Sequence, residues 1–393
     1  MTKSDESRPL KDRTKLVHAG RHPFEQHGFI NTPVYRGSTV LYRSYADLVA
    51  RNAKYTYGTH GTPTTDALET AWTEITGAAG TVLAPSGLSA VALALLTVVK
   101  AGDHILVSDS VYQPTRSFCE RFLTRIGVET TFYDPWLGED IASLIRPNTS
   151  VIFLETPGSQ TFEIQDVPAI VAVAAAKGLC TILDNTWATP LFFQAHGFGV
   201  DLVVEAGTKY LSGHADLLLG LVSANARWFP RLHATFDLFA NCPGPEDVFL
   251  ALRGLRSLEL RLREAERQGL ALATWLVERP EVARVLHPAL PDCPGHAIWK
   301  RDFRGSSGLF SAFLKPTSQK ALAAFLDGLK LFGMGYSWGG YESLVIPFDC
   351  SSYRSATKFA PEGPALRFSI GLEDPDDLKA DLAAGFERLK AAG

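Results

Sequence analysis

The 393-residue sequence lacks the features of several protein classes. No apolar run could span a bilayer, since the longest, SAVALALLTVV at 89–99, is far shorter than a membrane-crossing helix. The N-terminus is polar and charged, without a hydrophobic signal core. Cysteines are few and show neither CxxC spacing nor the density of a disulfide framework: Cys119, Cys180, Cys242, Cys293 and Cys350. We therefore expect no structural zinc site and no disulfides, and a location in the reducing cytoplasm.

An excess of positive charge is also missing. The chain has 38 Lys and Arg against 42 Asp and Glu, which gives a net charge of −4 and a pI near 6.2. Binding to a nucleic-acid backbone needs a basic surplus, so nucleic acid is not expected as the main partner. The remaining composition, 46% hydrophobic and 20% charged, is that of a globular protein long enough for two cores.

From about residue 65 onward, apolar strands alternate with helices. This order predicts an α/β fold with a mainly parallel sheet covered on both faces, and a ligand site beyond the carboxyl ends of its strands. The expected strands are 81–84, 104–109, 150–156, 180–186, 200–206 and 217–224, and the expected helices are 89–102, 114–127 and 167–178.

The C-terminal third of the sequence predicts a second, smaller unit. A long amphipathic helical stretch at 245–280 leads into it. The unit is α+β, with expected strands at 308–314, 342–348 and 365–371 and expected helices at 318–330 and 375–390. Residues 1–60 lack strong periodicity, and we expect an irregular arm that packs on a partner subunit, with disorder of this segment as the alternative.

Two charged residues end apolar strands of the larger unit. Asp184 closes CTILD and Lys209 follows VDLVVEA. If the two strands are neighbours, a carboxylate and an amine face one cleft. Such a pair suits pyridoxal phosphate (PLP), whose aldehyde forms a Schiff base with a lysine and whose ring nitrogen is held protonated by a carboxylate. The alternative is that both are ordinary surface residues at strand ends.

An anion site is expected at the segment APSGLSAV, 84–91. Backbone N–H groups of Gly87 and Leu88 at a helix N-terminus could hold a phosphate, and Thr208 could add a hydroxyl group. Tyr112, just past another strand end, could stack on a planar ring. The alternative for Gly87 is an ordinary glycine at the start of a buried helix. The alternative for Tyr112 is an ordinary buried aromatic residue.

A lone cation stands in the apolar strand ALRFSIG. This cation is Arg367, whose planar guanidinium can bind a carboxylate through two hydrogen bonds. An internal salt bridge is the alternative. The segment 334–344, MGYSWGGYESL, is rich in glycine and aromatic residues and is expected to form a loop.

With these residues identified, the sequence resembles the Cys/Met-metabolism family of PLP enzymes over nearly its whole length. The motifs that carry the resemblance are YGTHGTPT (57–64), DNTWATPLF (184–192), TKYLSGHAD (208–216), HPALP (287–291), WKRDFRGSSGLFS (299–311) and YSWGGYESL (336–344). The last is most similar to the β-eliminating branch. The resemblance implies the PLP-dependent transferase fold of type I, with a mainly parallel seven-stranded sheet in a large PLP-binding domain (61–253), a smaller C-terminal α+β domain (254–393) and the arm (1–60).

The resemblance also implies roles for the cofactor site. Lys209 would bond to the cofactor and carry protons, Asp184 would pair with the ring nitrogen, and Tyr112 would stack on the ring and contact the substrate. The cofactor phosphate would be bound by Gly87, Leu88 and Thr208.

For the substrate, the resemblance implies that Arg367 binds the α-carboxylate and that Ser337 and Trp338 line the site. Tyr57 would enter the site from a neighbouring subunit, which implies an oligomer, expected to be a homotetramer, with active sites shared between subunits. No metal is expected.

The activity implied is β-elimination of L-cystathionine to homocysteine, pyruvate and ammonia, a step of methionine biosynthesis. Three alternatives stay open: γ-elimination or γ-replacement by a relative within the family, a broader cysteine-S-conjugate β-lyase, and a regulator that keeps the enzyme fold without the cofactor.

Two positions depart from the family pattern. The family has Tyr-x-Arg where this sequence has Tyr57-Gly58-Thr59, and it often has a hydroxyl residue where Ala206 stands. Hydrogen bonds to charged groups contribute about 1.5–3 kcal/mol, so the missing arginine predicts weaker phosphate binding unless His60 or Arg36 compensates.

Overall fold

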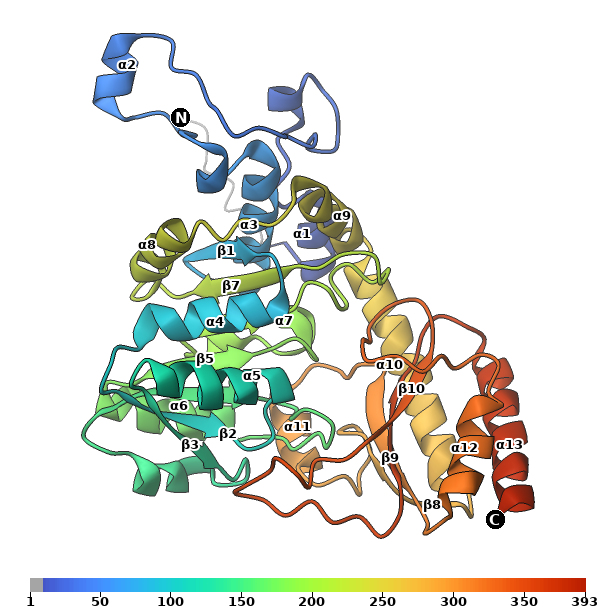
Figure 1. Ribbon diagram of the computed structural model, residues 1–393. Coiled ribbons are helices and arrows are strands. Elements are labelled where there is room, and N and C mark those ends of the chain that lie inside the picture. Colours follow the sequence, from blue (N-terminus) through green and yellow to red (C-terminus); the bar gives the residue numbers. More distant parts are fainter. Residues whose placement is uncertain (1–9) are drawn as a thin grey trace, which may run out of the picture.

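The computed structural model describes residues 10–393 and contains two sheets (Figure 1). The larger has seven strands in the order β1-β7-β6-β5-β4-β2-β3. β7 is antiparallel to both of its neighbours and every other pair is parallel, so the expected mainly parallel seven-stranded sheet is confirmed. Its strands are β1 Gly80–Ala84, β2 His104–Ser108, β3 Glu129–Tyr133, β4 Thr149–Glu155, β5 Cys180–Asp184, β6 Leu202–Glu205 and β7 Gly220–Ala224.

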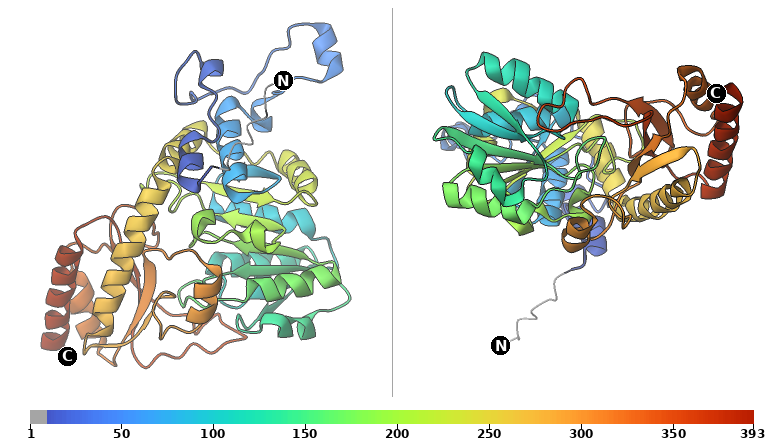
Figure 2. Two further views of the ribbon diagram at one scale, coloured as in Figure 1. Left: turned by 180° about the vertical axis from the view of Figure 1, so that it is seen from behind. Right: turned by 90° about the horizontal axis from the view of Figure 1, so that it is seen from below.

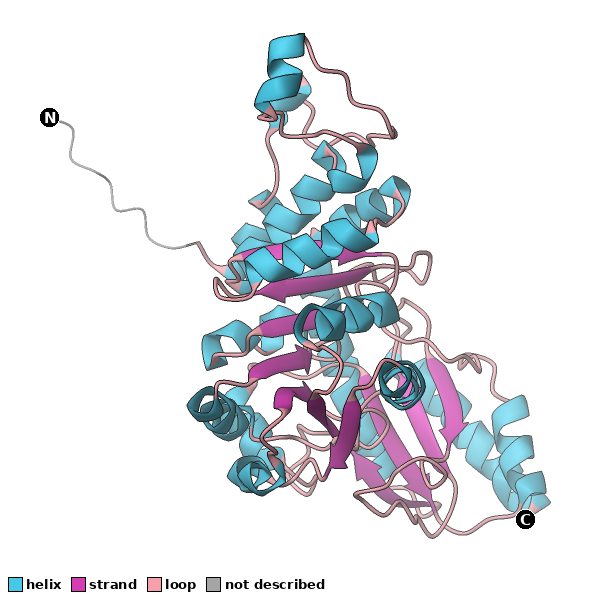
Figure 3. Ribbon diagram, turned by 60° about the vertical axis from the view of Figure 1, so that its left-hand side comes forward, coloured by secondary structure: helices cyan, strands magenta, loops and turns pink. Residues whose placement is uncertain are grey.

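Helices cover both faces of this sheet, as Figure 3 shows. Alternate residues of one strand enter different cores: Ile182 packs in the cluster with α4, and Leu183 packs in the cluster with α3 and α6. Near-continuous apolar strands are explained by this double burial. The helices around the sheet are α3 Pro63–Thr76, α4 Gly87–Val98, α5 Gln113–Ser117, α6 Val167–Lys177, α7 Thr189–Phe192, α8 Phe229–Phe239 and α9 Pro245–Leu255.

The smaller sheet is fully antiparallel, in the order β10-β11-β9-β8. Its apolar face packs on three helices in a third core that includes Phe310, Phe325 and Phe386. Figure 2 shows these helices along one side of the sheet. The strands are β8 Val282–Leu286, β9 Leu309–Leu314, β10 Leu344–Phe348 and β11 Ala365–Ser369, and the helices are α10 Leu258–Val277, α12 Gln319–Asp327 and α13 Pro375–Ala392; α11 His296–Asp302 lies between the two sheets.

The expected irregular arm contains two short helices, α1 Asp12–His18 and α2 Tyr45–Ala50. α1 is not free, because Leu16 is buried against α3 and α10. Beyond it, the chain projects away from the rest of the molecule (Figure 1), and α2 has no buried residue. The first nine residues of the expected arm lie outside the described residues.

The helical stretch expected at 245–280 consists of two helices, α9 and α10. The break falls at Arg256 and Ser257. Arg256 donates hydrogen bonds to the carbonyls of Leu16 and Ala19, and so ties α1 to this corner. A change of direction lets α9 pack on α3 while α10 reaches the small sheet.

Smaller differences concern helix ends and missed elements. α4 ends at Val98 rather than at Gly102, and the helix expected at 114–127 is π-helical between Phe118 and Leu123. The sequence interpretation missed β3, β8 and the helices α3, α7, α8 and α11, although α3 carries a capping box at Thr62. Within residues 10–393, no helix has the length and apolar character needed to cross a membrane.

Candidate active site

A cavity of about 240 Å³ opens at the carboxyl edge of the large sheet. Its walls come from the ends of four strands of this sheet: Ser86 follows β1, Glu155 ends β4, Asp184 ends β5 and Lys209 follows β6. The small sheet contributes Arg367 from β11. The expectation that Asp184 and Lys209 face one cleft is confirmed, because β5 and β6 are neighbours.

The structure brings nearly all of the predicted site residues together. The cavity is lined by eight of them: Gly87, Leu88, Tyr112, Asp184, Thr208, Lys209, Trp338 and Arg367. Ser337 lies beside them and accepts a hydrogen bond from Lys209. Tyr57 is the exception, since it lies in the arm and does not line this cavity within the single chain.

The surroundings of Lys209 favour the neutral form of its amine. Its Nζ donates to the Ser337 hydroxyl at 2.9 Å and lies 5.3 Å from the ring centroid of Trp338. Burial and the positive charge of Arg367 lower the pKa of Lys209 to about 8, against the opposing effect of Asp184. A lysine with this pKa is a competent nucleophile and base near neutral pH.

Arg367 has no carboxylate partner within residues 10–393. Its side chain is only 7% exposed, and it donates hydrogen bonds to the carbonyls of Tyr336 and Ser337 at 2.8 and 3.1 Å. Its Nε has no acceptor among the described residues. Burial lowers the pKa of Arg367 to about 10, so the group stays charged. The internal salt bridge considered from the sequence is therefore not formed, and the guanidinium is available to an anionic ligand.

Two carboxylates lie side by side at the cavity floor. Glu155 and Asp184 are paired in the register of β4 and β5. Burial raises the pKa of Asp184, but two hydrogen bonds from Thr186 and the charge of Lys209 favour its ionised form. Burial and the neighbouring Asp184 raise the pKa of Glu155 well above its ordinary value. We therefore assign the negative charge of the pair to Asp184.

The N-terminus of α4 forms the opposite end of the cavity. Ser86 caps this helix by accepting from the N–H of Ser89, and the N–H groups of Gly87 and Leu88 belong to the first turn, which has no acceptors within the helix. A Cβ at Gly87 would lie 2.7 Å from the Cβ of Ala206, so only glycine fits here. The Thr208 hydroxyl exchanges two hydrogen bonds with the backbone of Leu219, which occupies part of its capacity.

Aromatic side chains form the remaining walls. Tyr112 is half exposed, and its backbone N–H donates to the Glu155 carboxylate at 2.7 Å. Trp338 packs on Tyr210 with ring centroids 5.5 Å apart. A flat ring between Tyr112 and the lysine would thus meet an aromatic face, a carboxylate and a helix N-terminus.

The comparison with known protein families agrees with this geometry. The model of the Cys/Met metabolism PLP-dependent enzymes matches residues 13–387. The chain belongs to this family. It is therefore a PLP-dependent enzyme, and the resemblance described from the sequence motifs is confirmed.

Relatives of the chain come from both branches of the family. A cystathionine β-lyase of Salmonella typhimurium is 44% identical over 96% of this chain and 98% of its own length. A Saccharomyces cerevisiae protein provisionally named cystathionine β-lyase is 57% identical over 83% of this chain and 96% of its own length. The structure of a cystathionine γ-synthase from Xanthomonas oryzae superposes with a TM-score of 0.91 at 29% identity, and covers 98% of this chain and all of the other.

The cavity residues fit the cofactor of the family. PLP needs an amine of lowered pKa, a carboxylate for its ring nitrogen and a site for its phosphate. Lys209, Asp184 and the first turn of α4 meet these requirements in one cavity.

One departure from the family pattern, Thr59 in place of an arginine, lies away from the cavity of its own chain. Thr59 and His60 lie in the arm, where His60 Nδ1 is 2.9 Å from the Thr56 hydroxyl. Arg36, the other residue expected to compensate, is paired with Glu246 at 2.9 Å on the surface. None of these three lines the cavity of its own chain, so each could reach a phosphate only in a second copy.

Sequence reasoning missed several polar residues of the cavity: Ser86, Glu155, Ser159, Gln160 and Thr186. Glu155 carried the same signal as Asp184, a carboxylate that closes an apolar strand. Thr186 connects two strand ends, because its hydroxyl donates to Asp184 at 2.5 Å and accepts from the N–H of Ala206 at 2.9 Å. That bridging role depends on strand adjacency, which the sequence does not display.

Proposed function

We propose that the chain is a carbon–sulfur lyase that cleaves L-cystathionine by β-elimination, giving homocysteine, pyruvate and ammonia with the uptake of one water. The observation that carries the proposal is the buried pair of cations, Lys209 and Arg367, in one cavity with Asp184. The names of the relatives with 44% and 57% identity support the β-eliminating reading. Production of homocysteine places the reaction in methionine biosynthesis, and the five free cysteines agree with a reducing cytoplasm.

The chemical step depends on proton transfer by Lys209. Bound PLP supplies an electron-withdrawing ring that makes the Cα proton of the substrate removable. Nζ of Lys209 takes this proton, since its pKa of about 8 leaves a substantial neutral fraction near neutral pH. Ser337 accepts a hydrogen bond from Nζ and so keeps the amine within the cavity. As the Cβ–S bond breaks, Lys209 returns a proton to the leaving thiolate.

The other residues bind and orient. Arg367 binds the α-carboxylate of the substrate with the donors that have no carboxylate partner in the chain. Asp184 keeps the proton on the cofactor ring nitrogen, and Tyr112 stacks on the ring. The phosphate is bound by the N–H groups at the start of α4, with Thr208 beside them.

Product identification tests this function. The purified holoenzyme is given L-cystathionine, and the thiol and 2-oxo acid are identified by mass spectrometry. We expect homocysteine with pyruvate, and neither product from Lys209→Ala. Cysteine with 2-oxobutyrate would instead establish γ-elimination, the alternative within the family. Turnover of other cysteine S-conjugates without turnover of cystathionine would show that cystathionine is not the substrate.

We further propose that the arm packs on a second copy of the chain in a homotetramer and delivers Tyr57 to the neighbouring active site. Its apolar side chains lack any cover in the single chain: Phe24 is 97% exposed, Leu41 87% and Tyr45 81%. Soluble chains rarely expose so much apolar surface without a partner.

Mixing two inactive variants tests the shared site. Tyr57→Phe and Lys209→Ala would each be inactive alone. After dissociation and reassembly of the mixture, hybrid oligomers contain sites that carry both native residues, and activity returns. If the mixture stays inactive while native mass spectrometry, with a mass tag on one of the two variants, shows hybrid oligomers, Tyr57 acts within its own chain or not at all.

A further inference from the structure

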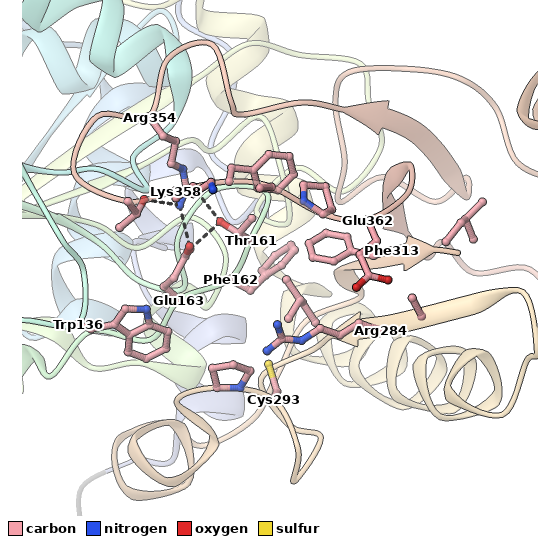
Figure 4. Close-up of a pocket in the computed structure, with 18 residues that line it drawn as sticks. Trp136, Thr161, Phe162, Glu163, Arg284, Cys293, Phe313, Arg354, Lys358 and Glu362 are labelled. Atoms are coloured by element: carbon pink, nitrogen blue, oxygen red, sulfur yellow. Dashed lines mark hydrogen bonds and ion pairs between the residues drawn. The ribbon is translucent and has the colours of Figure 1, made fainter. Parts of the chain in front are cut away.

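A second cavity, of about 570 Å³, lies on the other side of the segment 157–163 from the candidate active site. Figure 4 shows its lining. One wall is the edge of the small sheet with Arg284 and Phe313, and another is the strap, residues 349–363, which connects β10 to β11. The third wall is the segment from Thr161 to Glu163. No step of the proposed reaction uses this cavity.

The wall between the two cavities is shared. Phe162 lines both of them. Ser159 and Gln160 line the catalytic cavity, and the carbonyl of Ser159 accepts a hydrogen bond from Arg354, which lines the second cavity. A molecule that contacts Phe162 therefore touches a segment whose other face is the catalytic cavity, and one that contacts Arg354 touches a side chain hydrogen-bonded to that segment.

This segment holds an unusual backbone conformation. Gln160 and Phe162 have φ values of 70° and 58°, the left-handed region that residues with a Cβ rarely adopt. The conformation is maintained from outside the segment: Arg354 bonds to Glu163 at 2.7 Å and to the Thr161 hydroxyl, and Ser311 donates to the Gln160 carbonyl at 2.7 Å. Its geometry is thus set by contacts that belong to the second cavity and its walls.

The chemistry of the lining indicates a ligand class. Its floor is apolar and aromatic, with Phe162, Phe313 and Phe359 among the lining residues. Two exposed cations, Arg284 and Lys358, line the cavity together with the carboxylate of Glu362, and neither cation is in a salt bridge or a side-chain hydrogen bond within the described chain. The Nε of the buried Arg354 also lacks an acceptor there. An apolar body and an anionic head complement such a lining.

We propose that this cavity binds a carboxylate with an aromatic or aliphatic body, and that the bound molecule alters the catalytic cavity through the shared wall at Phe162. The carboxylate is placed at Arg284 and Lys358, and the body on the aromatic floor. The effect on catalysis rests on the proposed function, whereas the binding itself does not.

Calorimetry on the holoenzyme with 3-phenylpropionate tests the binding, and 3-phenylpropan-1-ol is the matched probe without the charge. We expect one molecule of the acid per chain and at least about fivefold weaker binding of the alcohol. Arg284→Ala and Lys358→Met should each weaken acid binding by about fivefold, and by more than tenfold together. Lys320→Ala removes an exposed cation outside the cavity and should change nothing.

The catalytic cavity also holds a cation, so the probe must be located. Binding that is lost in Arg367→Leu but unchanged in Arg284→Ala and Lys358→Met would place the acid in the catalytic cavity and overturn the proposal. Absence of binding at 10 mM probe, on the order of the weakest affinities worth considering, would overturn it as well.

A kinetic comparison tests the coupling. Saturating 3-phenylpropionate should change kcat/KM in the wild type and in Lys320→Ala, and should leave the double variant Arg284→Ala/Lys358→Met unaffected. Binding at Arg284 and Lys358 without any change in kcat or KM would overturn the coupling. If the enzyme does not turn over cystathionine at all, calorimetry still decides the binding, so failure of the proposed function is distinguishable.

Discussion

Two regions of the molecule bury arginine side chains and satisfy them differently. At the strap, Arg116 is paired with Asp109 at 2.9 Å and Arg354 with Glu163 at 2.7 Å, and both arginine side chains are 3% exposed. In the catalytic cavity, Arg367 meets only backbone carbonyls. Where the chain supplies a carboxylate, the buried charge is part of the structure. Where it supplies none, the charge is available to a ligand.

The carboxylates show the same contrast. Burial would raise the pKa of Asp109, but hydrogen bonds from Ser355, Thr357 and Arg116 together hold this pKa below its ordinary value. In the catalytic cavity, burial raises the pKa of Glu155 and Asp184, because fewer donors offset it. The ion pairs and hydrogen bonds at the strap therefore stabilise the fold, whereas the catalytic cavity holds groups whose protonation can change.

The largest effect is expected from Lys209→Ala. Loss of the amine removes both the bond to the cofactor and the proton carrier, so product formation should fall by about 10³-fold or more. The free energy of unfolding should not fall, because the lysine is a partly desolvated cation. Product assays and chemical denaturation measure the two quantities. An unfolded variant would show instead that the fold depends on Lys209.

Asp109→Asn is expected to act on stability alone. It leaves the guanidinium of Arg116 buried with Glu120 as its only remaining charged partner among the described residues and a hydrogen bond to Ser355, at a cost of about 3 kcal/mol in the free energy of unfolding. Since the pKa of Asp109 is lowered on folding, this contribution is present above the ordinary aspartate value of about 4 and is lost as the pH falls through the lowered one. Denaturation at pH 7 and pH 3 measures it; an equal deficit at both would contradict the assignment.

The pH dependence of cofactor capture distinguishes Lys209 from an ordinary lysine. Only the neutral amine attacks the aldehyde of PLP, so the rate for apoenzyme should rise about tenfold per pH unit below the pKa and level off near pH 8. A rise that continues towards 10.5, the ordinary lysine value, would show that the cavity does not lower this pKa. Stopped-flow absorbance follows the capture.

Arg367→Leu should lower kcat/KM by about 10- to 100-fold, because one charge-assisted contact to the substrate carboxylate is lost. Its stability should be equal to or above that of the wild type, since no carboxylate is left unpaired. The matched variant Arg354→Leu should do the reverse and destabilise the fold. Similar losses of stability in both variants would remove the distinction between the two regions.

The smallest effect concerns the arm. If no other group of a second copy binds the cofactor phosphate, Thr59→Arg should tighten PLP binding by about tenfold, the lower end of the range for a hydrogen bond to a charged group. Titration of apoenzyme measures the affinity. An unchanged affinity would show that the phosphate already has a cationic partner, with His60 and Arg36 as the candidates to substitute next.

Much of the fold followed from sequence patterns because the strands of the large sheet are buried on both faces. CTILD and VIFLE are apolar runs closed by a carboxylate, so the sequence shows both the strands and the charged residue that ends each of them. Only Asp184 was recognised as a site residue, and Glu155 was not. β3, Glu129–Tyr133, was missed because it is an edge strand with partly exposed residues and no apolar run.

The site was predictable only in part for a related reason. Residues on one strand or helix start, such as Asp184, Lys209 and Gly87, carry local signals. The partners that complete the site come from distant segments: Ser337 is 128 residues from Lys209, and the carbonyls around Arg367 lie about 30 residues before it. No local pattern reports such contacts, and the same holds for the shared wall at Phe162.

The most direct test of the account is to identify the residue that bonds to the cofactor. Borohydride reduction of the holoenzyme makes the lysine–PLP bond permanent, and peptide mass spectrometry then locates it. We predict modification of Lys209 alone, in the peptide that contains TKYLSGHAD. Modification of another lysine, or of none, would contradict the claim that this cavity holds the catalytic cofactor.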